Sequence, residues 1–451
     1  MSTTILWFRR DLRLSDHPAL VEAAQAAGSD GEVVALFCVD QRLWGPAGDN
    51  RRAFLVGCLH SLNETIGGRL VVRAGDPALV VAAVAAEVEA SQVFVTADFA
   101  PYGTERDEQV EQALADAGRV LMRVGSPYAV EPGTVVNGSG QPYKVFTPYS
   151  KAWRARGWPP SINAPGAMRW AALSSDRWPE AEASAAVQPE PGEAAAKLAA
   201  RTFYDHHLVD YDEQRNAPGA DATSRLSPYL KWGCIHPRQL LQTLGSSVAE
   251  QTFRNELCWR EFYADVLHHR PDTVRAAFNP AMAAMEVDDV GTDAAFAAWC
   301  AGRTGYPIVD AGMRQLVAEG FVHNRVRMLV ASFLVKDLHL DWSRGARFFM
   351  EHLVDGDLAS NQHGWQWVAG TGTDASPYFR IFNPVTQGER FDPGGTYVRR
   401  WVPELAAVAD KYVHHPWDDP AGAPTAYPAP MVDHAEEREE SLRRYAAVRG
   451  R

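Results

Sequence analysis

The sequence has no long hydrophobic run and few cysteines. No stretch of about 18 apolar residues occurs, which is the length of a membrane-spanning helix, so we expect no membrane partner. The five cysteines are scattered (38, 58, 234, 258, 300) and form no CxxC pair or Cys/His cluster. This pattern indicates no metal site and is typical of a reduced, cytoplasmic protein. Arg9, Arg10 and Asp11 directly follow the first apolar stretch, so the N-terminal residues do not resemble a signal peptide.

Positive charge is in the minority. The chain carries 44 Lys and Arg against 56 Asp and Glu, for a net charge of −12 and a pI near 5.6. This balance does not favour nucleic-acid binding, so any contact with DNA requires a local basic face. What the chain has in abundance is tryptophan, with 14 among 451 residues, a residue that is rarely placed without a packing or stacking role. At roughly 150 residues per domain, the length predicts two or three domains.

The first third alternates between two hydrophobic patterns. Apolar stretches predict strands over Thr3–Phe8, Glu32–Val39, Arg69–Arg73, Gln92–Ala97 and Arg119–Val124. Helical patterns lie between them over His17–Ala27, Arg51–Ile66, Ala78–Ala90 and Thr104–Ala117. Asp76 and Pro77 are typical N-cap and first-turn residues for the third helix. The alternation predicts an α/β domain with a doubly wound parallel sheet.

Ligands bind at the carboxyl ends of the strands in such sheets. Three of these ends carry Arg9–Asp11, Phe37–Asp40 and Asp98–Tyr102. No GxGxxG follows the first strand, which argues against an ordinary dinucleotide site. A role limited to helix capping and loop solvation is the alternative for these charged residues.

The rest of the chain has a different organisation. Residues 126–200 are rich in proline and lose the alternation, and Ala181–Ala200 is rich in Ala, Glu and Pro, which indicates a connector. Within it, the basic and aromatic Tyr143–Trp158 is expected to be ordered by packing between two units. Helical patterns then follow over Arg238–Leu244, Val248–His268, Asp293–Ala301, Pro307–Glu319, Asn324–Asp337, Ser343–His352 and Glu436–Arg449. We therefore expect an α/β domain (1–125), a connector (126–200) and an all-α domain (201–451).

The stretch Asp355–Trp367 combines carboxylates, an amide, an imidazole and two indoles. On a helix, Asn361 and Trp365 share a face and Trp367 points nearly opposite. Such density indicates a redox or stacking site, whereas either tryptophan alone fits ordinary core packing.

Three further clusters carry polar chemistry. Hydroxyls and a cation at 223–227 suit a diphosphate, although such residues more often cap helices. Glu256, Trp259 and Arg260 share a helical face that suits a flat polar ring, or a plain ion pair on a wet face. Asn324, Arg327 and Met328 share another face, with Arg325 turned away.

Seven segments together resemble the photolyase/cryptochrome family, most closely the class I cyclobutane pyrimidine dimer photolyases. They are WFRRDLRLSDHPAL (7–20), TSRLSPYLKWG (223–233), NELCWREFY (255–263), TGYPIVDAGMRQL (304–316), HNRVRMLVASFLVKDL (323–338), DGDLASNQHGWQW (355–367) and FRIFNPVTQGERFD (379–392). The resemblance implies an α/β antenna domain, a connector and a helical FAD domain.

The resemblance also implies roles for individual residues. FAD would be held by Tyr211, Thr223, Ser224, Arg225, Leu226, Ser227, Phe253, Arg260, Arg327, Asp355 and Asp357, with Asn361 at flavin N5. Glu256 and Asn324 would bind the dimer between Trp259 and Trp367, with Met328 beside them, and Arg325 would meet DNA phosphate or the lesion. Trp259 and Trp367 would thus contact DNA as well.

The implied reaction is light-driven electron transfer. Excited reduced flavin would give an electron to a flipped-out pyrimidine dimer in double- or single-stranded DNA, the cyclobutane bonds would break, and the electron would return. Flipping favours a dimer because it is already poorly stacked, and binding through phosphates would be salt-sensitive and nearly sequence-blind.

Two features depart from the family or leave a choice open. Trp365 and Trp342 match the first two members of the family's photoreduction chain, but the third, expected about ten residues before Trp299, is absent from Asp288–Gly291. Either another aromatic residue is the terminal donor, or this chain photoreduces its flavin poorly.

The antenna chromophore is the other open choice. The stretch Phe37, Cys38 and Asp40 with Lys231 resembles members that bind 8-hydroxy-5-deazaflavin, and methenyltetrahydrofolate is the alternative. Arg10 and Asp98 complete the expected antenna site.

Two other functions within the family remain alternatives. A cryptochrome photoreceptor shares the fold and the flavin, but the intact dimer pocket and the short segment after the helical domain favour repair. A (6-4) photolyase typically has histidines where this chain has Asn324 and Met328. A non-flavin α/β binding protein is a more distant possibility. We expect a monomer.

Overall fold

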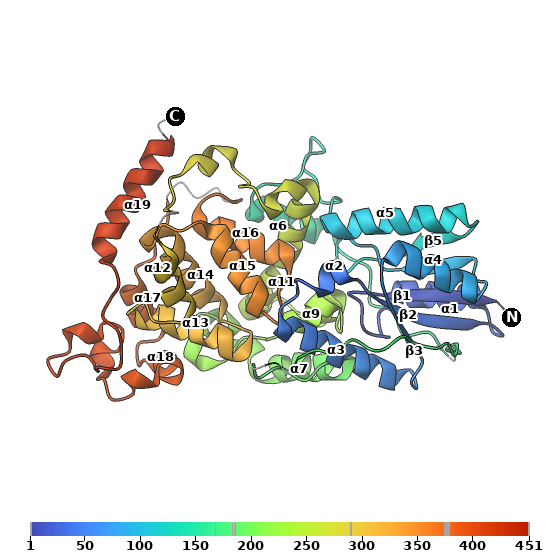
Figure 1. The fold of residues 1–451 in the computed structure, drawn as a ribbon, viewed down its shortest axis with the longest axis horizontal. Helices are drawn as coiled ribbons and strands as arrows, with labels where there is room; N and C mark the ends of the chain where they lie inside the picture. Colours follow the sequence, from blue (N-terminus) through green and yellow to red (C-terminus); the bar gives the residue numbers. More distant parts are fainter. Residues whose placement is uncertain are drawn as a thin grey trace.

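The computed structural model describes residues 2–166, 168–182, 184, 186–288, 291–373 and 379–449. Figure 1 shows two units side by side: a sheet with flanking helices, drawn in blue, and a larger helical unit that extends away from it. Helix α19 (His434–Arg449) lies at the far end from the N-terminus. Within the described residues, no helix combines the length and the apolarity needed to cross a bilayer.

The sheet is fully parallel, as predicted. Its strands are β1 (Thr3–Phe8), β2 (Glu32–Val39), β3 (Leu70–Ala74), β4 (Gln92–Val95) and β5 (Val120–Arg123), in the order β3-β2-β1-β4-β5. The helices that alternate with them are α1 (Pro18–Ala27), α2 (Gln41–Trp44), α3 (Asp49–Thr65), α4 (Pro77–Glu87) and α5 (Pro101–Asp116). The order reverses direction at β1, so ligand-binding residues are expected around its carboxyl end.

Both faces of the sheet are buried, which explains the continuous apolar runs of the strands. Leu6 and Phe8 of β1 face an apolar cluster that includes residues of α1 and α3. Ile5 and Trp7 face the opposite cluster, formed with α4 and α5. Asp76 caps α4 through Ala78 N–H at 2.9 Å, as predicted.

The connector is more ordered than its composition indicates. Helix α6 (Phe146–Arg156) packs against α11 (Val248–His269), and the indole N–H of the buried Trp153 donates to Glu261 at 2.6 Å. This confirms that Tyr143–Trp158 is ordered by packing. Helix α7 (Glu193–His206) begins inside the predicted connector, where no helix was predicted, and its buried Ala196, Ala200 and Phe203 form an apolar face.

The remaining helices make up the second unit. The α-helices are α8 (Tyr211–Gln214), α9 (Ser227–Trp232), α10 (Pro237–Leu241), α12 (Asp293–Cys300), α13 (Pro307–Glu319), α14 (Asn324–Ser332), α15 (Trp342–His352), α16 (Leu358–Ala369), α17 (Pro384–Phe391) and α18 (Thr396–Trp401). Short 3₁₀ turns cover Leu208–Asp210, Pro218–Ala220, Pro271–Val274, Pro280–Ala284, Pro403–Leu405, Asp410–Tyr412 and Pro416–Asp418. The helix predicted over Asn324–Asp337 changes to a π-helical turn at Phe333–Asp337.

Candidate functional site

Helix α16 lies in the middle of the second unit, between α11, α14 and α15. Asp357 caps its N-terminus by accepting from Ser360 N–H at 3.1 Å. Trp365 is buried, with its ring 5.1 Å from that of Phe349 on α15. Gly345 of α15 leaves room for this indole, because a Cβ there would lie 2.2 Å from Trp365.

Asn361 and Trp367 occupy different surroundings on the same helix. The side-chain amide of the buried Asn361 donates to the carbonyl of Ala346 at 3.1 Å and to Gln362 Oε1 at 3.0 Å. Those bonds use its N–H groups, and no described residue donates to its carbonyl oxygen, which is therefore available to a ligand. Trp367 is half-buried with Arg380 over its ring, so the predicted divergence of Trp365 and Trp367 is confirmed.

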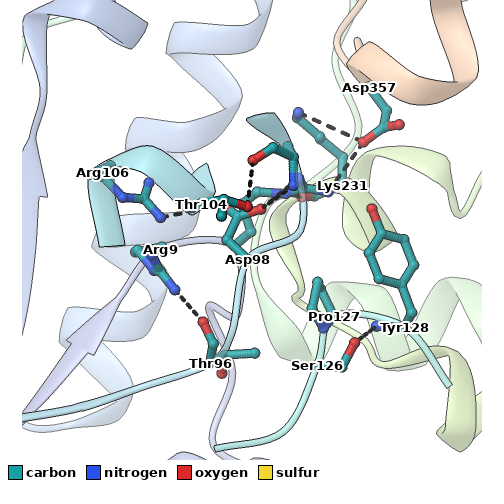
Figure 2. A network of polar contacts seen from close by, with 12 residues as sticks. Arg9, Thr96, Asp98, Thr104, Arg106, Ser126, Pro127, Tyr128, Lys231 and Asp357 are labelled. Carbon is teal, nitrogen blue, oxygen red and sulfur yellow. Dashed lines mark hydrogen bonds and ion pairs between the residues drawn. The ribbon is translucent and has the colours of Figure 1, made fainter. Parts of the chain in front are cut away.

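Asp357 also joins the two units. Its Oδ2 lies 3.1 Å from Arg10, which follows β1. The same oxygen lies 4.0 Å from Lys231 of α9 (Figure 2). Burial alone would raise the pKa of Asp357, but the charges of Lys231, Arg10 and Arg260 lower it overall. Residues expected at the antenna site and at the FAD site therefore share one cluster.

In the same surroundings the charged form of Lys231 is disfavoured, whereas the charged form of Asp357 is favoured. Burial, together with the charge of Arg10, lowers the pKa of Lys231 to about 7 despite the neighbouring Asp357. Arg260 completes the cluster by donating to the carbonyls of Pro127 at 3.3 Å and Leu230 at 3.2 Å. Its guanidinium also lies over the ring of Tyr128.

The other expected antenna residues lie along the same edge of the sheet. Asp98 contacts Arg10 at 4.0 Å. It also contacts Arg106 at 3.3 Å (Figure 2). Asp40 accepts from Tyr102 and caps α2.

These strand-end residues are closely packed. Phe37 is buried in the core, and Cys38 is also buried, which raises its pKa to about 12. A cavity of about 10 Å³ beside Arg10 and Asp98 is too small for a chromophore, so binding one requires side chains to move.

The expected FAD-binding residues approach the site from several elements. Arg327 of α14 pairs with Asp355 at 3.1 Å. Tyr211 and Phe253 are buried with their rings 5.6 Å apart.

The predicted phosphate loop, Thr223–Ser227, precedes and enters α9. Ser224 Oγ accepts from Leu226 N–H at 3.4 Å, and Arg225 has a φ of +48°. The Arg225 guanidinium is already paired with Asp221 at 2.7 Å and Glu319 at 2.9 Å. Hydroxyls and backbone N–H groups, rather than this guanidinium, therefore fit a diphosphate here.

Glu256 forms an ion pair that the sequence did not indicate. Arg215, which follows α8, lies 2.7 Å from its carboxylate. Burial raises the pKa of Glu256 even though Arg215 opposes the shift. The two residues are far apart in sequence, and the helical periodicity of α11 pointed only to its own Arg260.

Arg215, Arg325 and Arg390 form a group of cations that we call the basic rim. The residue after Arg215, Asn216, accepts from Arg325 at 2.6 Å. Arg325 and Arg390 both lie over the ring of Phe391. Burial and the charges of Arg215 and Arg390 lower the pKa of Arg325, so the rim suits an anion.

The aromatic and apolar residues predicted to form the dimer pocket come from three helices. Asn324 is exposed at the first turn of α14, while Met328 and Trp367 are partly buried against the same core cluster. Trp259 stacks on Phe146 of the connector, with ring centroids 3.6 Å apart. No sequence pattern indicated that Phe146 covers one face of this indole.

Two family models match the chain. The model for the FAD binding domain of DNA photolyase matches residues 253–447, and that for DNA photolyase matches residues 4–166. The deoxyribodipyrimidine photo-lyase of Streptomyces griseus is 41% identical, covering 97% of this chain and 98% of its own length. The enzyme of the same name from Vibrio cholerae is 39% identical, covering 99% and 100%.

The chain belongs to the DNA photolyase family.

Solved photolyase structures share the fold. A bacterial class III photolyase from Agrobacterium tumefaciens has a TM-score of 0.90 and 38% identity, covering 100% of this chain and 98% of its own. An archaeal photolyase from Sulfolobus tokodaii, described with two FAD molecules, has a TM-score of 0.85 and 28% identity over 99% and 100%. The cryptochrome of Synechocystis has a TM-score of 0.87 and 28% identity over 98% and 99%.

The two predicted photoreduction tryptophans, Trp365 and Trp342, lie in one apolar cluster. Trp299 belongs to the same cluster, and its ring is 6.1 Å from that of Trp365. Where the third photoreduction tryptophan was expected, Asp288 pairs with Arg444 at 2.8 Å, and residues 289–290 lie outside the described part of the chain.

Proposed function

We propose that this protein repairs cyclobutane pyrimidine dimers in DNA with light, as a deoxyribodipyrimidine photo-lyase. The single observation that carries the proposal is the helical arrangement around α16. It places Asn361, whose side-chain carbonyl accepts no hydrogen bond from the described residues, on a helix that packs against α11, which carries Glu256 and Trp259, and against α14, which carries Met328. Curated relatives of that name match the chain at about 40% identity over nearly its full length.

FAD fits the donor set that the chain offers. The free acceptor of Asn361 suits flavin N5–H, the Arg327–Asp355 pair supplies a fixed donor and acceptor, and the hydroxyls of 223–227 suit the phosphates. When bound and reduced, FAD would supply light-driven one-electron donation to the dimer. Asn361 has no acidic proton to give, so it would hold the flavin edge without protonating it.

The lesion would bind at Glu256. Its carboxylate would accept from the base N–H. Because Arg215 occupies Glu256 in this structure, we infer that lesion binding opens this ion pair and frees Arg215 for a phosphate. Trp259 and Trp367 would flank the extruded bases.

DNA would bind along the basic rim. Arg215, Arg325 and Arg390 are close enough to depress the pKa of Arg325, and a phosphate would relieve that repulsion. Exposed cations on α6, next to Trp259, extend the basic face. We propose a cytoplasmic monomer with the division 1–125, 126–200 and 201–451.

We also propose an antenna chromophore at the strand ends, 8-hydroxy-5-deazaflavin rather than methenyltetrahydrofolate. Support comes from two cations near the strand ends, since Arg10 lies 4.0 Å from Asp98 and Lys231 lies 4.0 Å from Asp357. The photolyase from Sulfolobus tokodaii is described with a second FAD as a light-harvesting cofactor, which indicates that a flavin-like ring suits a related fold. Mass spectrometry of the released chromophores tests the choice.

The repair reaction is tested with oligothymidylate that contains dimers. Illumination of the reduced protein should restore absorbance at the base band as the dimers split. No recovery with flavin bound and reduced would favour the cryptochrome alternative.

Two variants of α11 separate lesion binding from folding. Glu256→Ala should weaken repair while FAD stays bound. Glu261→Ala is the contrast, because Glu261 accepts from Ala129 N–H, Val130 N–H and Trp153, so its loss should lower stability first. Loss of FAD from the Glu256→Ala protein would contradict the assignment.

A further inference from the structure

Trp259 of α11 has an aromatic ring of the connector on one of its faces. The ring of Phe146 lies parallel to the indole, with the centroids 3.6 Å apart and an angle of 5° between the planes. Both side chains are half-buried. Because Phe146 covers one face of the indole, a base that stacks on Trp259 must use the opposite face.

Helix α6 sets the position of Phe146 through its buried side. Phe146, Tyr149 and Trp153 are three and four residues apart, so they share one face of this helix. Tyr149 and Trp153 are 1% and 0% exposed. The ring of Tyr149 lies 5.0 Å from that of Phe262 on α11, and the indole of Trp153 donates to Glu261 at 2.6 Å. The start of α6 is therefore held against α11 by contacts that do not involve Trp259.

Two carboxylates of α11 bind the backbone of the connector as well. Glu261 accepts from Val130 N–H at 3.0 Å, and Asp265, one turn later, accepts from Gly133 N–H at 2.7 Å. Both carboxylates are almost fully buried, where a missing hydrogen-bond partner is costly. The connector is therefore fixed to the same helix that carries Trp259.

The neighbours of Trp259 on its own helix support the indole less completely. Phe262 meets it edge-on, with centroids 5.7 Å apart. Tyr263 lies 5.4 Å away at an angle of 43°. Neither ring is parallel to the indole, so the parallel contact with Phe146 is what limits tilting of the Trp259 ring. A side chain that is already ordered in the free protein loses less entropy when a ligand binds.

We propose that Phe146 is a positioning residue for lesion binding, which holds Trp259 so that one defined face of the indole receives an extruded pyrimidine. The inference rests on the proposed function, in which Trp259 flanks the extruded dimer. Bases of an undamaged duplex stay stacked in the DNA and are costly to extrude. Phe146 therefore favours damaged DNA over undamaged DNA, and it acts through Trp259.

Binding in the dark is the first test, by fluorescence anisotropy with the FAD-loaded protein. One labelled duplex contains a single thymine dimer, and a second duplex of the same sequence is undamaged. Phe146→Leu keeps an apolar side chain but loses the stack, so affinity for the dimer duplex should fall about 2- to 10-fold, with affinity for the undamaged duplex unchanged. Phe146→Tyr keeps the stack and should bind as the wild type does. Phe146→Met is a second variant without the stack, for use if Phe146→Leu folds poorly.

Phe296→Leu is the matched control. Phe296 of α12 is also half-buried, and its ring lies 5.8 Å from that of Trp299 at an angle of 21°. Its loss should lower the free energy of unfolding without changing the affinity for either duplex. An equal loss of dimer affinity in Phe146→Leu and Phe296→Leu would refute a specific role for Phe146. Tighter dimer binding by Phe146→Leu would show that Phe146 occupies the place of a base, which would also overturn the proposal.

Repair under light separates positioning from chemistry. With chemically reduced Phe146→Leu, the dimer concentration at half-maximal rate should rise by the factor measured in the dark, while the rate at saturation stays at the wild-type value. A lower saturated rate with an unchanged half-saturation concentration would contradict the inference.

The wild-type protein distinguishes this inference from the proposed function. A wild type that binds both duplexes equally and splits no dimers would count against the photolyase assignment itself. A wild type that prefers and repairs the dimer duplex, with the same preference in Phe146→Leu, would count only against the role of Phe146.

Discussion

Replacing Gly345 by alanine tests whether α15 is shaped to seat Trp365. A Cβ at this position would lie 2.2 Å from Trp365 and 2.5 Å from Leu334, so side chains of the core must move. Overpacking of this kind costs about 1–3 kcal/mol. Alanine also gains about 1 kcal/mol over glycine in a helix interior.

Gly364→Ala is the matched control. Gly364 lies inside α16, and a Cβ there would meet nothing within 4 Å. It should therefore gain about 1 kcal/mol, and Gly345→Ala should be less stable than Gly364→Ala by about 1–3 kcal/mol, the cost of overpacking alone.

Urea unfolding followed by tryptophan fluorescence gives the two free energies. The flavin-to-protein absorbance ratio reports whether the displaced indole disturbs the site around Asn361. Equal free energies of unfolding and full flavin content in both variants would refute the packing argument.

Three further outcomes are expected. Between pH 7 and about 10.5, Lys231 is protonated in the unfolded chain but deprotonated in the folded protein, where its pKa is about 7. The free energy of unfolding should therefore rise with pH in this range. Lys336 also has a pKa of about 7, so each of the two lysines should contribute about half of this rise. Urea titrations of Lys231→Met at pH 7 and 9.5 should therefore show about half of the wild-type rise. An unchanged rise would contradict the burial of Lys231. Arg325→Met should reduce the slope of log affinity against log salt by about one in fluorescence-anisotropy titrations with DNA, whereas the exposed Arg177→Met should not change it. Arg215→Met should raise the pKa of Glu256 further, seen as a shift of the pH profile of lesion binding to higher pH, and a shift in the other direction would exclude the ion pair.

The sequence predicted the order of the strands and of the long helices of the α/β unit, because parallel strands buried on both faces leave long apolar runs. Glu32–Val39 was predicted with the bounds that it has. The Asp76 cap was predicted for a similar reason, since a cap is a local interaction between residues two apart.

Interactions across long sequence separations could not be predicted. The Arg10–Asp357 pair joins residues 347 positions apart, and neither periodicity nor spacing marks it. Arg215 was missed because α8 has only four residues and shows no amphipathic pattern. Helix α7 was missed because alanine and glutamate next to prolines have the composition of a linker as well as of a helix.

The site residues were found through the family resemblance rather than through patterns alone. Helical spacing placed Asn361 and Trp365 on one face, which the structure confirms. It could not show that the side-chain amide of Asn361 uses only its N–H donors in hydrogen bonds to the described residues. That distinction depends on the carbonyl of Ala346, which α15 supplies.

The Arg10–Asp357 contact has a consequence for recombinant chimeras. A hybrid with the sheet of one family member and the helices of another would combine an end of β1 and a start of α16 that did not occur together in either parent. If the incoming strand end lacked a cation, the start of α16 would keep a buried carboxylate with only Lys231 and the more distant Arg260 as counter-charges. Hybrids in which residue 10 comes from the same parent as the helices should therefore retain more flavin than hybrids in which it comes from the parent of the sheet.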